Sequence, residues 1–301
     1  MSVPAVALTG RISVASRVGA YVALTKPRII ELLLITTLPT MILAKGGLPA
    51  VWLMIATLLG GALAAGGANA INMYVDRDID KLMHRTRKRP LVTGVIAPRN
   101  ALIFAVTLEV VAFVELWAWV NLLSAVLAVS ATLFYVFVYT LWLKRTSKQN
   151  IVIGGAAGAM PVLVGWAAVT NSLAWAPLVL FGIIFMWTPP HFWALAFKYR
   201  DDYEAASVPM MPVVATFRRT AAEILAYTVV MVGLTILLAP VAHLGAVYLA
   251  AAGVLGAGFI AMSVRLWVRA TPKASMQLFS YSITYLTLLF VAMAVDVFLL
   301  H

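Results

Sequence analysis

Cysteine is absent from this 301-residue chain and charge is scarce, since only 11% of the residues are charged. The missing thiols exclude disulfide bonds, thiolate zinc sites and cysteine nucleophiles. The scarce charge excludes an ordinary soluble domain, in which about a quarter of the residues are charged. Because 63% of the residues are hydrophobic, a water-soluble fold could not bury them all, and the solvent around this chain must be lipid.

Long apolar runs recur along the chain, and a helix that spans a bilayer needs about 20 such residues. The runs cover residues 29–45, 50–74, 100–119, 121–143, 151–170, 174–197, 221–240, 243–264 and 278–300. We therefore expect an all-α integral membrane protein with nine transmembrane helices. They form one domain over residues 26–301, preceded by a cytoplasmic N-terminal segment over residues 1–25.

The net charge of +11 comes from basic residues that lie between the apolar runs. If the N-terminus is inside, the inner gaps are residues 77–99, 144–148, 198–219 and 265–273. Of the 22 lysine and arginine residues, only Lys45 then falls outside. Cytoplasmic loops carry such an excess, which predicts a cytoplasmic N-terminus and an outer C-terminus. Basic residues placed in this way set topology and contact anionic lipid, so we expect no nucleic-acid partner.

The few acidic residues are clustered. Of the 11 aspartate and glutamate residues, six lie in the two long inner segments. Asn72, Asp76 and Asp80 are spaced four apart at the end of the second span, which on a helix places them on one face. Carboxylates at the lipid boundary usually face a polar cavity, and oxygen ligands without cysteine or histidine suit Mg²⁺. This column therefore predicts a Mg²⁺ site at the inner mouth of the bundle.

A basic run follows the column, and it consists of Arg85, Arg87, Lys88 and Arg89. Such a run suits a polyanion, but it is also typical of a solvated loop that only fixes topology. Because phosphate oxygens commonly complete the shell of Mg²⁺, acids and bases together suggest a metal-bridged diphosphate on a lipid-soluble tail. A further acidic group follows the sixth span at Asp201, Asp202 and Glu204. It predicts either a second metal or diphosphate site or a helix-end cluster of internal pairs.

The pattern Asn72-x-x-x-Asp76-x-x-x-Asp80 on the second span resembles the UbiA superfamily of intramembrane prenyltransferases. Further stretches resemble the branch of that superfamily that farnesylates haem. These stretches are Asp76–Leu91, Leu143–Thr146, Asn150–Pro161, Trp187–Leu195 and Asp202-Tyr203 with Val208–Pro212. One departure is Lys198, which stands where superfamily relatives carry an aspartate four residues before Asp202.

The resemblance implies a reaction and a set of site residues. The farnesyl group of farnesyl diphosphate passes to a vinyl group of protohaem IX (haem B), which gives haem O for terminal oxidases. Asn72, Asp76 and Asp80 hold Mg²⁺, with Asp202 as a further catalytic residue. The candidates for diphosphate binding are Arg85, Arg89, Lys144 and Arg145. The expected location is a bacterial cytoplasmic membrane, with a mitochondrial inner membrane as the alternative, and haem A synthase or oxidase assembly factors are possible partners.

His191 lies within the sixth span, after the paired prolines Pro189-Pro190. Paired prolines break or kink a helix, so the ring beside them is expected to face the cavity. It could bind haem through the iron or a propionate, or make a structural hydrogen bond. A farnesyl cation also needs a dry, aromatic-lined cavity, for which the candidates are Tyr135, Tyr139, Trp187, Phe192 and Trp193.

Two other functions remain open at this point. The first is prenyl transfer to an aromatic acceptor such as a quinone precursor, because the Asn72–Asp76–Asp80 column does not distinguish acceptors. The second is transport, because charges inside a membrane often mark ion paths. Against transport, the acids cluster at one mouth and no charged series crosses the midplane.

Overall fold

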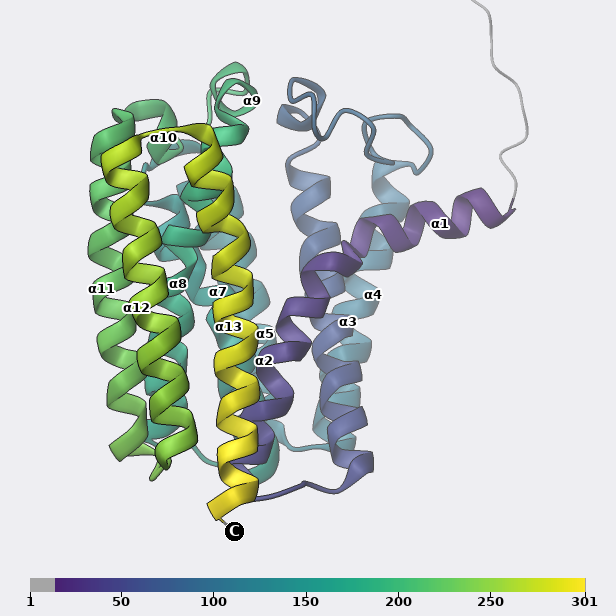
Figure 1. Ribbon diagram of the computed structural model, residues 1–301. Helices are drawn as coiled ribbons and strands as arrows, with labels where there is room; N and C mark the ends of the chain where they lie inside the picture. Colours follow the sequence, from purple (N-terminus) through teal and green to yellow (C-terminus); the bar gives the residue numbers. More distant parts are fainter. Residues whose placement is uncertain (1–13, 301) are drawn as a thin grey trace, which may run out of the picture.

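The computed structural model describes residues 14–300, and all secondary structure assigned within that range is helical (Figure 1). The first 13 residues of the predicted N-terminal segment and the C-terminal residue lie outside the described range. The elements are α1 (Val14–Thr25), α2 (Pro27–Lys45), α3 (Val51–Val75), η1 (Ile79–Lys81), α4 (Pro98–Trp119), α5 (Leu122–Leu133), η2 (Phe134–Leu143), α6 (Lys144–Thr146), α7 (Asn150–Thr170), α8 (Trp175–Lys198), α9 (Arg200–Ala205), α10 (Met211–Val214), α11 (Phe217–Val241), α12 (Ala246–Arg269) and α13 (Pro272–Leu300).

Eight helices among the described residues are long and apolar enough to cross a membrane. They are α3, α4, the continuous run α5–η2–α6, α7, α8, α11, α12 and α13. Each lies on a predicted apolar run, and the largest difference is at the start of α13, which begins at Pro272 rather than at residue 278. The multi-pass all-α architecture is confirmed. The ninth span stays a prediction, although α2 covers its position, and so does the orientation of the termini.

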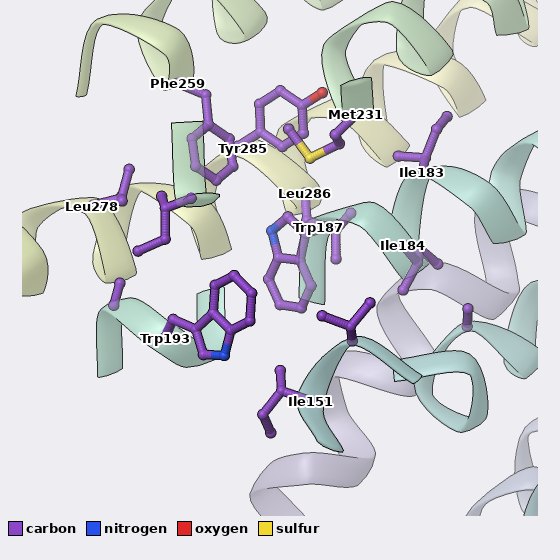
Figure 2. Packing of buried hydrophobic residues seen from close by; sticks show 14 of the residues in the cluster. Ile151, Ile183, Ile184, Trp187, Trp193, Met231, Phe259, Leu278, Tyr285 and Leu286 are labelled. Carbon is purple, nitrogen blue, oxygen red and sulfur yellow. The ribbon is translucent and has the colours of Figure 1, made fainter. Parts of the chain in front are cut away.

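Large apolar side chains cover the outside of the bundle, which is the reverse of a soluble fold. Trp117 on α4, Trp175 on α8 and Val254 on α12 expose 58%, 77% and 74% of their surfaces. The interior is also apolar. Figure 2 shows side chains of α7, α8, α11, α12 and α13 meeting in one cluster, with Trp187 of α8 beside Leu286 of α13. Contact with lipid explains the apolar side chains on the outside of the bundle, and close packing between helices explains the apolar side chains in its interior.

Glycines bring α7 close to its neighbours. A Cβ added to Gly165 would lie 2.9 Å from the backbone oxygen of Thr37 on α2, and one added to Gly155 would lie 2.9 Å from Thr188 on α8. Small residues that let helices approach in this way are typical of membrane bundles. A Cβ on Gly158, by contrast, would meet nothing within 4 Å. Close packing therefore explains Gly155 and Gly165, whereas Gly158 borders open space.

The two long connections, residues 76–97 and 199–216, lie at the same end of the bundle, and the last turn of α13 lies at the opposite end (Figure 1). Pro189 and Pro190 do not break the sixth span, because α8 continues through both residues to Lys198, and the alternative of a kink at these residues stays a prediction. Their ring nitrogens still cannot donate the usual helix bonds. In the bundle these two residues are buried on all sides, and tertiary packing holds the helix together through them.

Candidate active site

Asn72, Asp76 and Asp80 come together as the sequence predicts, although α3 already ends at Val75. The column survives because the backbone N–H of Asp76 donates to Asn72 O, and that of Asp80 donates to Asp76 O, each at 2.9 Å. All three residues are buried, with exposures of 3%, 0% and 1%. An ionised carboxylate is stable at such depth only if it is paired or bound to a metal.

Each of these three residues contacts a basic side chain. Lys26 Nζ donates to Asn72 Oδ1 at 2.8 Å, Arg89 Nη1 lies 2.6 Å from Asp80 Oδ2, and Lys144 Nζ donates to Asp76 Oδ2. We call these six residues the ionic cluster, and it consists of Lys26, Asn72, Asp76, Asp80, Arg89 and Lys144. Two of the predicted diphosphate-binding residues, Arg89 and Lys144, therefore lie beside the acids, and their role in binding diphosphate stays a prediction.

Lys26 was missed by the sequence reasoning, since only its position at the start of the first span could have indicated it. It lies between α1 and α2 in a left-handed conformation, with φ 52° and ψ 66°, so the chain turns there and directs the side chain toward α3. Burial and the nearby charges of Arg89 and Lys144 lower the pKa of Lys26 to about 7. Three bases thus converge on two carboxylates, an arrangement that an added polyanion would stabilise.

Arg145, a third predicted diphosphate ligand, lies at the edge of the ionic cluster. Its guanidinium makes two bonds of 2.7 Å to Asp78 and is 3.8 Å from Asp76 Oδ1. The hydrogen bond from Arg145 lowers the pKa of the Asp78 carboxyl to about 2. Asp78 is more than half exposed, so this pair faces outward while Lys144 faces inward.

Asp202 joins the two long connections. Its carboxylate oxygens accept hydrogen bonds from the backbone N–H groups of His84 and Arg85, both at 3.0 Å. The fourth predicted diphosphate ligand, Arg85, places its guanidinium 5.1 Å from the ring centre of Tyr199. In this arrangement Asp202 acts through the backbone of residues 84–85, and its catalytic role stays a prediction.

A π-helix, η2, shapes the other side of the column, and nothing in the sequence indicated it. Thr140 Oγ1 donates to Tyr135 O, five residues back, at 2.8 Å, and accepts from Asn72 Nδ2 at 3.1 Å. The rings of Tyr135 and Tyr139 stack with their centres 5.3 Å apart. Since π-helical turns are frequent at functional sites, this segment supports the assignment of the site. It places two of the predicted aromatic residues beside the ionic cluster.

His191 lies in a separate group of residues, where α8 meets α13. Its Nδ1 is 2.7 Å from Ser282 Oγ, and its ring stacks on Trp187 with centres 4.1 Å apart and lies 4.7 Å from the ring of Phe279. We call Trp187, His191, Phe279 and Ser282 the His191 cluster. Of the other predicted aromatics, Phe192 lies edge-on to His191, and Trp193 is fully buried.

The ionic cluster has the donor set for Mg²⁺. Asp76 Oδ1 is buried and accepts no hydrogen bond, and the nearest basic group, Arg145, is 3.8 Å away, so this oxygen could bind a metal. Within residues 14–300 no group of three or more His, Cys, Asp or Glu could hold a metal, so the protein offers two carboxylates and one amide. That number suits Mg²⁺ in a complex with phosphate oxygens and does not suit a closed zinc site.

Comparison with known proteins agrees with this site. The UbiA prenyltransferase family model matches residues 33–293. The chain is 52% identical over 293 residues to the protoheme IX farnesyltransferase of Renibacterium salmoninarum, covering 96% of this chain and 92% of that protein. It is 56% identical over 281 residues to protoheme IX farnesyltransferase 1 of Saccharopolyspora erythraea, covering 92% and 89%.

Solved structures show the same fold at low identity. A digeranylgeranylglyceryl phosphate synthase superposes with a TM-score of 0.77 at 16% identity, over 93% of this chain and 98% of that chain. A UbiA homologue from Archaeoglobus fulgidus, bound to GPP and Mg²⁺, superposes with a TM-score of 0.63 at 17% identity, over 92% and 99%. From the family match and the two close relatives together, the chain belongs to the UbiA prenyltransferase family and, within it, to the protoheme IX farnesyltransferases.

Proposed function

We propose that this protein transfers the farnesyl group of farnesyl diphosphate to a vinyl group of protohaem IX, with Mg²⁺, and so makes haem O. The observation that carries the proposal is the buried ionic cluster, in a chain more than half identical to protoheme IX farnesyltransferases. Asp76 and Asp80 would serve as metal ligands together with Asn72. Lys26, Arg89 and Lys144 would bind the diphosphate.

The first step needs charge stabilisation on the leaving group. The bond between C1 of the farnesyl chain and the diphosphate oxygen breaks, and the electron pair leaves with the oxygen. Asn72, Asp76 and Asp80 would hold Mg²⁺, which would supply Lewis-acid stabilisation of the leaving diphosphate. Lys144 and Arg89, which lie beside Asp76 and Asp80, donate hydrogen bonds to the developing charge. Lys26 adds a third positive group on the side of Asn72.

The second step needs a dry cavity. The vinyl group of haem attacks C1, water adds to the resulting cation, and one proton is released. The stacked rings of Tyr135 and Tyr139 beside the ionic cluster would stabilise the farnesyl cation through their faces and keep water away from it. Asp202 would keep Arg85 over the site through the two backbone hydrogen bonds that it accepts.

The acceptor would lie on the side of the His191 cluster, with His191 as its binding residue. The aromatic rings of that cluster suit a flat macrocycle. We further infer a location in the bacterial cytoplasmic membrane, which is supported by the multi-pass fold and by bacterial relatives. A protein in that place would supply haem O to a terminal oxidase or to a haem A synthase.

A turnover assay with a panel of acceptors tests the proposal. The full-length protein in lipid nanodiscs receives farnesyl diphosphate, Mg²⁺ and either haem B or an aromatic quinone precursor, and products are identified by mass. We expect haem B alone to be modified, with a gain in mass of one farnesyl group and one hydroxyl group. The proposal fails if haem stays unmodified while the aromatic acceptor is prenylated.

A further inference from the structure

Ser282 of α13 makes two short contacts through one hydroxyl group. Its Oγ lies 2.6 Å from the backbone oxygen of Phe279 on the same helix and 2.7 Å from Nδ1 of His191 on α8. Ser282 is fully buried, so water does not compete for either contact. The two contacts together form a chain of three polar atoms that runs from the imidazole ring to a helix carbonyl.

Only one placement of the hydrogens satisfies both contacts of Ser282 Oγ. The carbonyl of Phe279 can only accept, so the single Ser282 hydrogen must lie on that contact if the two oxygens are to stay 2.6 Å apart. The contact with His191 then carries a hydrogen only if Nδ1–H donates to Ser282 Oγ. In the other arrangement, with the hydroxyl donating to Nδ1, two oxygen acceptors would face each other without a proton. The neutral ring is therefore the Nδ1–H tautomer, and Nε2 keeps its lone pair.

The ring of His191 is also held in place. Trp187 stacks on it with an angle of 18° between the planes, and the indole N–H of Trp187 donates to the backbone oxygen of Ser282 at 2.9 Å. Nε2 makes no hydrogen bond to any residue in the described range. It is not among the buried atoms that lack a partner, and His191 keeps 8% of its surface exposed. Nε2 thus borders accessible space.

We propose that Ser282 is a positioning residue that holds His191 in this tautomer, so that Nε2 binds the iron of the haem substrate as an axial ligand. This inference rests on the proposed function and goes beyond it. A neutral imidazole with a bare Nε2 cannot donate a hydrogen bond to a haem propionate, but it can bind a metal. Histidines that bind metals generally donate their other N–H to an oxygen acceptor that fixes the ring, which is the role of Ser282 here.

Haem titrations of four variants test the role of Ser282. The full-length protein in nanodiscs is titrated with haem B, and the axial ligand is identified by electron paramagnetic resonance and visible absorption. We expect a nitrogen ligand in the wild type and its loss in His191→Ala. Ser282→Ala should weaken haem binding about 10- to 100-fold, the usual effect of removing such a partner, while Ser282→Thr, which keeps the hydroxyl, should retain the ligand. Ser275→Ala is the matched control, because Ser275 is buried on the same helix and bonds to Pro272 O but to no histidine.

A double variant separates positioning from mere packing. If Ser282 acts only through His191, Ser282→Ala has no further effect on haem affinity in the His191→Ala background. A persistent loss there, with a fall in melting temperature, would show a structural role and overturn the inference. It is also overturned if Ser282→Ala or His191→Ala keeps the wild-type nitrogen ligand and affinity. Formation of haem O by the wild type, measured in parallel, shows that such a result concerns Ser282 and not the proposed function.

Discussion

The ionic cluster and the His191 cluster satisfy their buried polar groups in opposite ways. The first pairs carboxylates with lysine and arginine, as in Asp76 with Lys144 and Asp80 with Arg89. The second uses neutral donors and acceptors, and in the same way Thr235 of α11 and Tyr285 of α13 share a bond of 2.7 Å. Paired charges can be exchanged for those of a ligand, whereas a neutral, aromatic region suits an apolar one. The difference supports the proposal that the diphosphate binds at the ionic cluster and the macrocycle at the His191 cluster.

The largest effect expected of a single substitution follows from a change within the ionic cluster. Asp76→Asn should lower kcat by about 100- to 1,000-fold, the range observed when one charge-stabilising group is removed, and should be measured as haem O formed per minute. The control is Asp78→Asn, because Asp78 is 59% exposed and pairs only with Arg145 at the edge of the site. An equal loss of kcat in both variants would contradict the claim that buried Asp76 takes part in the reaction and exposed Asp78 does not.

Metal removal tests the same region without a mutation. Chelation of Mg²⁺ should abolish turnover, since the column provides only two carboxylates and the leaving diphosphate needs the metal charge. Added Mg²⁺ should restore it, while haem binding at the His191 cluster should stay unchanged throughout. Turnover that persists in a chelator would contradict the assignment of the column.

A change in the His191 cluster should separate the two regions. His191→Ala should weaken haem binding at least as much as Ser282→Ala, for which about 10- to 100-fold is expected, but should leave the slow hydrolysis of farnesyl diphosphate by water intact. Diphosphate release without haem measures the hydrolysis, and haem titration measures haem binding. Loss of both activities together would mean that the two regions are not independent.

The smallest effect is expected at Lys26. Lys26→Ala should weaken binding of farnesyl diphosphate about tenfold, which corresponds to about 1.5 kcal/mol, the lower end of what a hydrogen bond to a charged group contributes. Since the pKa of Lys26 is lowered to about 7, the free protein loses this charge as pH rises through 7. Wild-type affinity should therefore fall over that range, and the variant should show a flatter profile. Lys45→Ala, at the other end of α2, is the control that should bind normally.

Local sequence pattern predicted most of the fold and part of the site. The apolar runs matched the helices because lipid requires about 20 apolar residues for each span, and the spacing of Asn72, Asp76 and Asp80 survived the end of α3. The missed contacts join residues far apart in the chain. Lys26 and Asn72 are 46 residues apart, Asn72 and Thr140 are 68 apart, and His191 and Ser282 are 91 apart. Helix periodicity carries no information on such pairs, which depend on how the helices pack.

The most direct test of the two-region account is a density map of the protein in nanodiscs with haem B, Mg²⁺ and an unreactive farnesyl thiodiphosphate. The account predicts metal density between the diphosphate and the oxygens of Asn72, Asp76 and Asp80, with the haem iron within bonding distance of His191 Nε2. A diphosphate bound away from this column, or a haem bound away from α8, would contradict it.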